Sequence, residues 1–179
     1  MSAQGELTRV YVGLGSNRGD RLEFLDRAVA ELGALEETRI GPCSSVYETE
    51  PVGVKEQREF LNMVVGLAMP VSPHHLYETM KAIESKIGRV SSTRWGPREI
   101  DLDILYFGGR ILKTSGLEIP HAEVARRRFV LEPLAEIAPD FVDPVRMLTI
   151  RQLLAACPDT SAVRKTALRL HSTTAVKVP

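Results

Sequence analysis

Two apolar stretches of the chain, residues 38–47 and 60–68, follow each other without a helical pattern between them. The segment that joins them is polar and rich in turn-forming residues, with Pro51 and Gly53 near its start. Parallel strands need a long crossover connection, usually a helix, whereas antiparallel neighbours can be joined directly. The two stretches therefore exclude a simple doubly wound parallel sheet.

The other segments complete a strand–helix–strand–strand–helix–strand order. Residues 9–15 and 100–107 have strand composition, whereas residues 21–32 and 73–87 carry apolar residues at spacings of three and four. We predict an α+β fold of the ferredoxin-like sandwich type (βαββαβ), with a four-stranded antiparallel sheet and both helices on one face. Residues 148–156 predict a short helix in a C-terminal helical extension.

The chain length predicts one domain over residues 1–179. After Asp159 the sequence has no acidic residue but keeps Arg164, Lys165, Arg169 and Lys177. This composition predicts a flexible basic tail over residues 160–179.

The overall charge is balanced, with 23 basic and 23 acidic residues. A protein that coats nucleic acid needs a basic excess, so we expect no nucleic-acid partner. The two cysteines, Cys43 and Cys157, lack the spacing of a disulfide framework or a zinc site. No secretion signal and no membrane-length apolar run is visible, so we expect a cytoplasmic protein without a membrane partner.

Two aspartates, Asp101 and Asp103, lie one residue apart in the strand predicted over residues 100–107. Side chains alternate along a strand, so both carboxylates point the same way, roughly 6–7 Å apart, while Leu102 and Ile104 point into a core. Neighbouring carboxylates repel unless a cation lies between them. Mg²⁺ is typically held by one or two carboxylates together with substrate phosphates.

Two arginines, Arg94 and Arg98, lie on the loop just before this strand, and guanidinium groups bind phosphate oxygens in bidentate fashion. The combination indicates a metal–polyphosphate site. Solvated salt bridges at the end of a surface strand are the alternative, because an Asp-x-Asp motif is weak by itself.

A pair of glycines, Gly13 and Gly15, ends the first predicted strand. A dinucleotide-binding motif would place its third glycine at position 18, which is Arg18. We therefore interpret the glycines as part of a tight strand-to-helix turn in which the backbone approaches closely.

Several motifs together resemble the 6-hydroxymethyl-7,8-dihydropterin pyrophosphokinase (HPPK) family of folate biosynthesis. The resemblance covers roughly residues 9–158. Its strongest part is the segment from Arg94 to Leu105, which contains Gly96-Pro97-Arg98 and Asp101-Leu102-Asp103. Further matching segments occur in the family's order: Val12–Asn17, Tyr47–Gly53, Phe60–Asn62, Glu84 with Gly88-Arg89, Pro120-His121 and Arg127-x-Phe129.

The resemblance implies that residues 9–158 form the catalytic core of a diphosphotransferase that moves pyrophosphate from ATP to the hydroxymethyl group of the reduced pterin and releases AMP. We expect the chain to be a monomer. It implies two Mg²⁺ ions held by Asp101 and Asp103, and a mobile arginine-rich loop that closes over ATP. The implied catalytic residues are Arg89, Arg98, Asp101 and Asp103. The implied ATP contacts are Glu84, Arg94, Trp95, Arg98, Ile104, His121 and Arg127.

The implied pterin site depends on stacking between Phe60 and Phe129 and on hydrogen bonds to the amide-like edge of the ring. The full set is Thr49, Glu50, Val52, Phe60, Asn62, Trp95 and Phe129. Apart from the resemblance, Phe60 and Phe129 fit core positions and His121 fits an ordinary loop histidine. Arg126 and Arg128, on either side of Arg127, are expected in solvent.

The sequence departs from the family pattern at a few positions. Phe60 stands where members often have Tyr, Ala122 where some have an aromatic residue, and Ser91 and Ser92 where some relatives are basic. These departures bear on ATP affinity and rate. Two other classes of function remain: a ferredoxin-like module that binds RNA, and a catalytically silent homologue that acts as a pathway scaffold.

Overall fold

A computed structural model of the chain describes residues 6–53, 56–90 and 96–172. The strands are β1 (Thr8–Ser16), β2 (Arg39–Cys43), β3 (Tyr47–Thr49), β4 (Phe60–Met69), β5 (Asp101–Phe107), β6 (Leu112–Lys113), β7 (Glu118–Ile119) and β8 (Val163–Lys165). The helices are α1 (Arg21–Gly33), α2 (Pro73–Ile87), the 3-10 helix η1 (Val124–Arg126), α3 (Arg128–Ile137) and α4 (Ile150–Ala155). The predicted site residues Arg94 and Trp95 lie outside the described residues, as do Ser91 and Ser92.

Local sequence signals explain where the two long helices begin and end. The Asp20 side chain accepts a hydrogen bond from the Glu23 amide at the start of α1, and Ser72 caps α2 through the His75 amide. Gly88 ends α2 in a left-handed conformation with φ 109°, which glycine adopts without steric cost. Each helix buries one apolar stripe.

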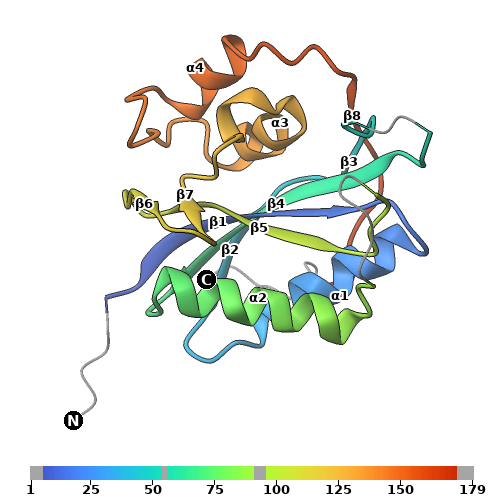
Figure 1. The fold of residues 1–179 in the computed structure, drawn as a ribbon, viewed down its shortest axis with the longest axis horizontal. Helices are drawn as coiled ribbons and strands as arrows, with labels where there is room; N and C mark the ends of the chain where they lie inside the picture. The colour runs from blue at the N-terminus through green and yellow to red at the C-terminus, as the bar shows by residue number, and fades with distance from the viewer. Residues whose placement is uncertain (1–5, 54–55, 91–95, 173–179) are drawn as a thin grey trace.

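The main sheet separates two helical layers, with α1 and α2 on one face and α3 and α4 on the other (Figure 1). Its strand order is β5-β1-β4-β3-β8, and β2 also pairs with β4. The pairs β1–β4, β1–β5 and β3–β4 are antiparallel, so the predicted α+β fold is confirmed. No helix in the described part of the chain has the length and apolarity needed to cross a bilayer.

The predicted strand over residues 38–47 is in fact two strands, β2 and β3. Pairing with β4 shifts register between Ile40 and Cys43, where Pro42 has no amide to donate. The Ser44 hydroxyl accepts a hydrogen bond from the Val64 amide at 2.9 Å and spans the interruption. The chain then resumes pairing with β4 at Tyr47.

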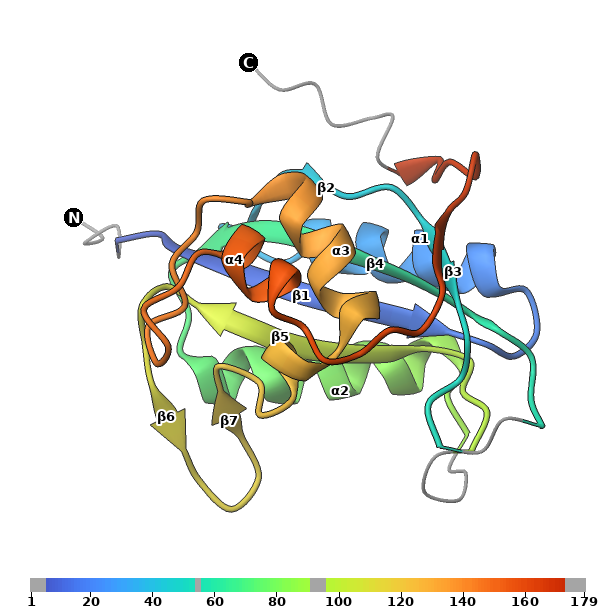
Figure 2. The same cartoon turned by 90° about the horizontal axis from the view of Figure 1, so that it is seen from above.

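Each face of the sheet has its own core, because side chains alternate along the strands. Val10, Val12 and Leu14 of β1 pack toward α1 and α2, whereas Tyr11 packs toward α3 and α4. The register of β5 shifts opposite Tyr11 and Val12. Seen from above, α3 and α4 lie across part of the sheet (Figure 2).

Residues 160–172, the described part of the flexible tail predicted over residues 160–179, are ordered against the sheet, whereas residues 173–179 lie outside the described residues. Val163–Lys165 forms β8 and pairs with β3, and Leu170 is 4% exposed within the core on the α1 and α2 face. Composition missed this because a three-residue edge strand buries little surface and leaves no clear pattern.

A carboxylate on α3 joins three of these segments. Glu136 accepts hydrogen bonds from the Tyr47 hydroxyl at 2.8 Å, from Ser45 and from the Lys165 ammonium at 2.9 Å. Burial alone raises the pKa of Glu136, but these hydrogen bonds outweigh burial and lower its pKa to about 2.

A pH prediction follows from this depressed pKa. The stabilisation from Glu136 is fully present above the ordinary glutamate pKa, near 4.5, and is lost as pH falls toward about 2. In Glu136→Gln the free energy of unfolding should therefore fall less steeply than in wild type as pH decreases between these two values. Urea titrations at a series of pH values measure this dependence. Glu132→Gln, which removes an i,i+4 pair with Arg128 on the same helix, is the matched control. An unchanged acid limb in Glu136→Gln would contradict the assignment.

Candidate active site

The central strand β1 has no side chains at two alternate positions on the face toward α3. Gly15 lies in register between Asn62 of β4 and Asp101 of β5. A Cβ at Gly15 would lie 2.7 Å from the Asn62 Oδ1, and one at Gly13 would lie 3.3 Å from Leu105. The glycines therefore leave a trough between two flanking strands, whose side chains are about 10 Å apart across two strand spacings.

This trough forms the floor of a pocket beside α3, where the helical layer no longer covers the sheet. One end is lined by Thr49, Glu50, Val52, Phe60, Asn62 and Phe129. The other end is lined by Arg98, Asp101, Asp103, His121 and Arg127. A polar and partly aromatic half thus meets a strongly charged half within one cavity.

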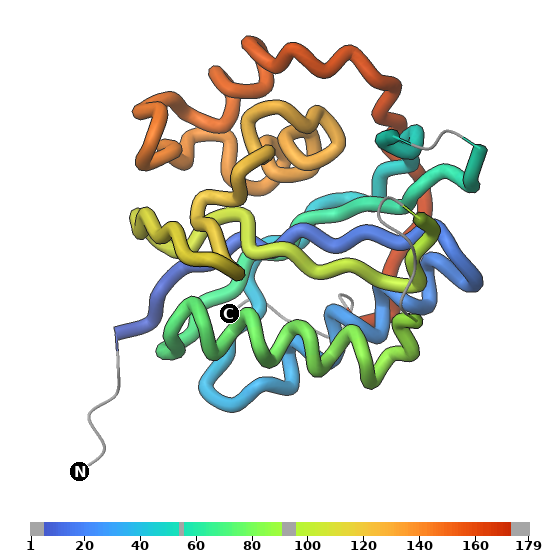
Figure 3. The backbone as a smooth tube through the Cα atoms, in the orientation of Figure 1, coloured from blue at the N-terminus to red at the C-terminus, as the bar shows by residue number. Residues whose placement is uncertain are grey.

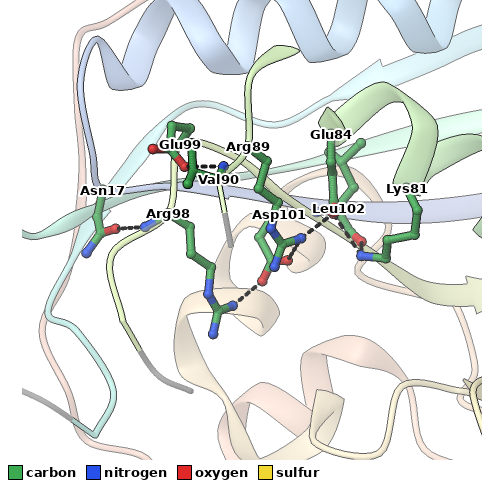
Figure 4. Close-up of polar contacts among 9 residues, drawn as sticks. All are labelled: Asn17, Lys81, Glu84, Arg89, Val90, Arg98, Glu99, Asp101 and Leu102. Atoms are coloured by element: carbon green, nitrogen blue, oxygen red, sulfur yellow. Dashed lines mark hydrogen bonds and ion pairs between the residues drawn. The ribbon is translucent and has the colours of Figure 1, made fainter. Parts of the chain in front are cut away.

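The acidic pair projects from β5 into this pocket, as the alternation of the strand predicts. Asp101 forms ion pairs with Arg89, at 2.9 Å from Oδ1, and with Arg98 through Oδ2 (Figure 4). Burial opposes the charge of Arg89, but Asp101 and Glu84 outweigh it and raise the pKa of Arg89. Two cations therefore neutralise Asp101 in this structure.

The second carboxylate, Asp103, accepts no hydrogen bond from any residue in the described part of the chain. Burial and the negative charge of Asp101 raise the pKa of Asp103. The nearby charges of His121, Lys81 and Arg127 act in the opposite direction without cancelling this rise. A cation placed between the two aspartates would remove the cause of this electrostatic cost.

The donor set fits Mg²⁺ if a ligand completes it. Within the described residues no group of three or more His, Cys, Asp or Glu side chains is placed to hold a metal ion. Asp101 and Asp103 therefore supply two carboxylates and no more, which is the number that Mg²⁺ commonly takes when phosphates and water provide the remaining oxygens.

A buried glutamate on α2 supports the acidic strand from behind. Glu84, 2% exposed, accepts a hydrogen bond from the Leu102 amide at 2.7 Å and one from Lys81 at 2.8 Å. Its other oxygen pairs with Arg89. Glu84 therefore fixes the backbone between the two aspartates and the guanidinium beside Asp101.

A buried asparagine at the end of β1 connects the two loops that border the pocket. The Asn17 Oδ1 accepts from the Arg98 amide at 2.8 Å, and its Nδ2 donates to Gln57 and to the Arg58 carbonyl. Glu99 accepts from the Val90 amide at 3.2 Å. The bonds of Asn17 tie the backbone at Arg98 to the loop before β4, and Figure 4 shows the Asn17–Arg98 and Val90–Glu99 bonds.

His121 and Arg127 line the charged half of the pocket, close enough to Asp103 to interact with its charge. The Nδ1 of His121 accepts a hydrogen bond from the Glu123 amide at 3.1 Å, so neutral His121 carries its proton on Nε2. Nε2 is thus a donor, suited to an anionic oxygen. Arg127 lies 5.8 Å from the ring centroid of Phe129, which joins the charged and aromatic halves.

At the other end, Asn62 and Thr49 form a rigid polar pair. The Asn62 Nδ2 donates to the Thr49 Oγ1 at 2.7 Å, and both residues are at most 7% exposed. This bond orients the Asn62 Oδ1 over Gly15. The pair can read a planar ligand that presents amide-like groups.

Most of the predicted site residues lie together. All predicted pterin-site residues in the described part of the chain line the pocket, as do five of the predicted ATP and catalytic residues, and Glu84 and Arg89 lie beside Asp101. Ile104 differs: its side chain is 3% exposed in the core toward α1 and α2, on the face opposite the aspartates. Strand alternation forces this placement once Asp101 and Asp103 face the pocket.

Sequence reasoning missed the role of the glycines and of two polar residues. Gly13 and Gly15 lie within β1, not in a turn after it, and alternate glycines within a strand were the available signal for close approach. Nothing local in the sequence indicated that Asn17 bridges two loops, because this depends on tertiary contacts. Lys81 and Glu84 lie three residues apart on α2, and this spacing was the available signal for their ion pair.

Comparisons with known proteins agree with this geometry. Residues 11–139 match the family described as 7,8-dihydro-6-hydroxymethylpterin-pyrophosphokinase (HPPK). Two bacterial relatives are named 2-amino-4-hydroxy-6-hydroxymethyldihydropteridine pyrophosphokinase. The one from Synechocystis is 45% identical over 80% of this chain and 73% of the relative, and that from Methylorubrum extorquens is 44% identical over 83% and 93%.

Solved structures share the fold at low sequence identity. Wild-type HPPK-DHPS from Plasmodium falciparum superposes with a TM-score of 0.64 at 16% identity, over 87% of this chain. This chain spans 45% of that longer protein. The likeness shows that the two proteins share a fold.

The buried position of Glu84 generates a stability prediction. Glu84→Ala should lower the free energy of unfolding by about 3 kcal/mol, because Arg89 loses a partner and the Leu102 amide is left unpaired. Urea denaturation of the variant and wild type measures the difference. Glu118→Ala is the control, since its pair with Lys113 at 3.7 Å is exposed, and it should change stability by less than about 0.5 kcal/mol. Equal effects would show that Glu84 is not the support described.

Proposed function

The chain belongs to the 7,8-dihydro-6-hydroxymethylpterin-pyrophosphokinase family, and from that premise we propose that it transfers pyrophosphate from ATP to 6-hydroxymethyl-7,8-dihydropterin, releasing AMP, in folate biosynthesis. The observation that supports this best is the row Asn62–Gly15–Asp101 across three strands. Asn62 can hydrogen-bond the edge of a pterin, and Asp101 can help hold a metal–phosphate complex. Gly15 lies between them and leaves a floor without side chains.

The pterin occupies the polar and aromatic half of the pocket. Phe60 and Phe129 supply apolar faces for the bicyclic ring, and each aromatic contact adds about 0.5–1.5 kcal/mol beyond area burial. Asn62, held by Thr49, reads the amide-like edge. Glu50 and Val52 border this half from the loop after β3.

The triphosphate of ATP occupies the charged half. Two Mg²⁺ ions, held by Asp101 and Asp103, would supply charge neutralisation for the phosphates and a lowered pKa for the attacking hydroxyl. Arg98, His121 Nε2 and Arg127 donate to phosphate oxygens, and Arg89 keeps Asp101 in place. Arg98 exchanges its contact with Asp101 for a phosphate when ATP binds.

The reaction then depends on alignment. The hydroxymethyl group loses its proton to solvent as its oxygen bonds to the β-phosphorus, the bond from the β-phosphorus to the oxygen that bridges it to the α-phosphorus breaks, and AMP leaves with that oxygen. Such transfers need positioning and charge stabilisation more than covalent help. Arg94 and Trp95, with the loop that carries them, are proposed to close over ATP and exclude water, which would compete as the nucleophile.

The rival functions have less support. An RNA-binding sheet of this type exposes aromatic residues on its central strands. Here Tyr11 of the interior strand β1 is buried beneath α3 and α4, as is Tyr106 of the edge strand β5. A silent scaffold would not need Asp101, Asp103, Arg89 and Arg98 gathered around one pocket. We propose that the chain works as a cytoplasmic monomer on two small molecules.

The direct test is AMP formation from ATP with and without the pterin, in the presence and absence of Mg²⁺. Wild-type protein should form AMP only when both are supplied. Asp103→Asn preserves side-chain volume but removes charge, and it should lower turnover by about 10²-fold or more. Asp140→Asn, an exposed carboxylate on the loop before α4, is the matched control. AMP formation without pterin, or wild-type turnover in Asp103→Asn, would refute the proposal.

The glycine floor gives a second prediction. Gly15→Ala places a Cβ against the Asn62 Oδ1, so Asn62 must move and the KM for the pterin should rise about tenfold, with the KM for ATP little changed. Gly109→Ala is the control, because nothing lies within 4 Å of the added Cβ. Steady-state kinetics with each substrate varied separates the two KM values. A larger effect on the KM for ATP would place the pterin elsewhere.

A further inference from the structure

Residues 163–172 run along the edge of the sheet and continue to the opposite helical layer. We call this segment the strap. It leaves the layer of α3 and α4, pairs through β8 with β3, and reaches the layer of α1 (Figure 3). The family match ends at residue 139, so the strap lies beyond the region that the family shares.

The strap is anchored at both ends and in the middle. At its start, Lys165 pairs with Glu136 of α3 and Arg164 pairs with Glu48 and Glu59. In the middle, the amide and the hydroxyl of Thr166 both donate to the Val46 carbonyl at 2.9 Å. At its end Leu170 is buried, and Ser172 donates to Asp26 of α1 through its amide and its hydroxyl at 2.8 and 2.7 Å.

The strand that the strap holds is short and carries a site residue. β3 has three residues, and Thr49 lies in register between Phe60 of β4 and Val163 of β8. Without β8, β3 would be an edge strand paired on one side, and strands of this length have little stability of their own. Thr49 fixes Asn62, so the position of β3 determines the polar half of the pocket.

We propose that the strap is a positioning element: by pairing with β3 it holds Thr49, and through it Asn62, in the geometry that the pterin requires. The role in pterin binding rests on the proposed function. The charged half of the pocket is built on β5 and the segment after β7, which the strap does not pair with. Loss of the strap contact should therefore affect the two substrates unequally.

The test uses the full chain with Arg164→Glu, which places a carboxylate beside Glu48 and Glu59. The KM for the pterin should rise about tenfold, while kcat and the KM for ATP stay within about twofold. Arg164→Lys should restore the wild-type KM. Asp26→Ala, which removes the hydrogen bonds to Ser172 at the end of the strap, should also raise the KM for the pterin. Arg151→Glu, a reversal at an exposed pair with Asp140, is the matched control and should leave every constant unchanged.

Hydrogen exchange of the peptide that contains residues 46–49 provides a readout independent of activity. Exchange there should be faster in Arg164→Glu than in Arg151→Glu. Unchanged exchange would show that the strap does not hold β3. Faster exchange with an unchanged KM for the pterin would show that the strap holds β3 but does not position the pterin site. A wild type that forms no AMP with pterin would refute the proposed function and the positioning role together, while the exchange result still decides whether the strap holds β3.

Discussion

The absence of side chains at Gly13 and Gly15 is the constraint on which the rest of the site depends. β1 is an interior strand that pairs with β4 and β5, and its other face carries Val12 and Leu14, which fill the core. With any larger residue at position 15, the Asn62 amide could not lie across the strand. The trough lets a ligand touch β4 and β5 at once, so a pocket exists on a sheet face that would otherwise be covered or flat.

The two ends of this trough differ in their charged groups. One end holds two carboxylates that share Arg89 and Arg98 unevenly: Asp101 has both guanidinium groups, whereas Asp103 has no hydrogen-bonding partner in the described part of the chain. The other end carries a single, exposed carboxylate, Glu50, and its buried polar residues Asn62 and Thr49 are already bonded to each other. A ligand with one polyanionic part and one planar amide-like part satisfies both ends, and a pterin together with ATP has this form.

Much of this could be predicted from the sequence, because the determining patterns are local. Strand alternation placed Asp101 and Asp103 on one face, and apolar residues at spacings of three and four marked the two long helices. The remainder depends on contacts between distant segments. Residues 38–47 are split into two strands because of their register against β4. Residues 163–172 are ordered because they pair with an edge that exists only in the folded sheet. The function of Gly15 depends on Asn62, which lies far away in the chain. The core position of the Ile104 side chain follows from the same alternation, and the ATP contact that the family resemblance implies for Ile104 stays a prediction.

The central claim is that Asp101 and Asp103 together gather two divalent ions around a bound nucleotide. Electron paramagnetic resonance of Mn²⁺, with a non-hydrolysable ATP analogue and the pterin present, tests it most directly. The account predicts two bound ions per chain with spin coupling between them, and loss of the coupled signal in Asp103→Asn. A single uncoupled ion in the wild type, or a coupled signal that survives Asp103→Asn, would contradict it.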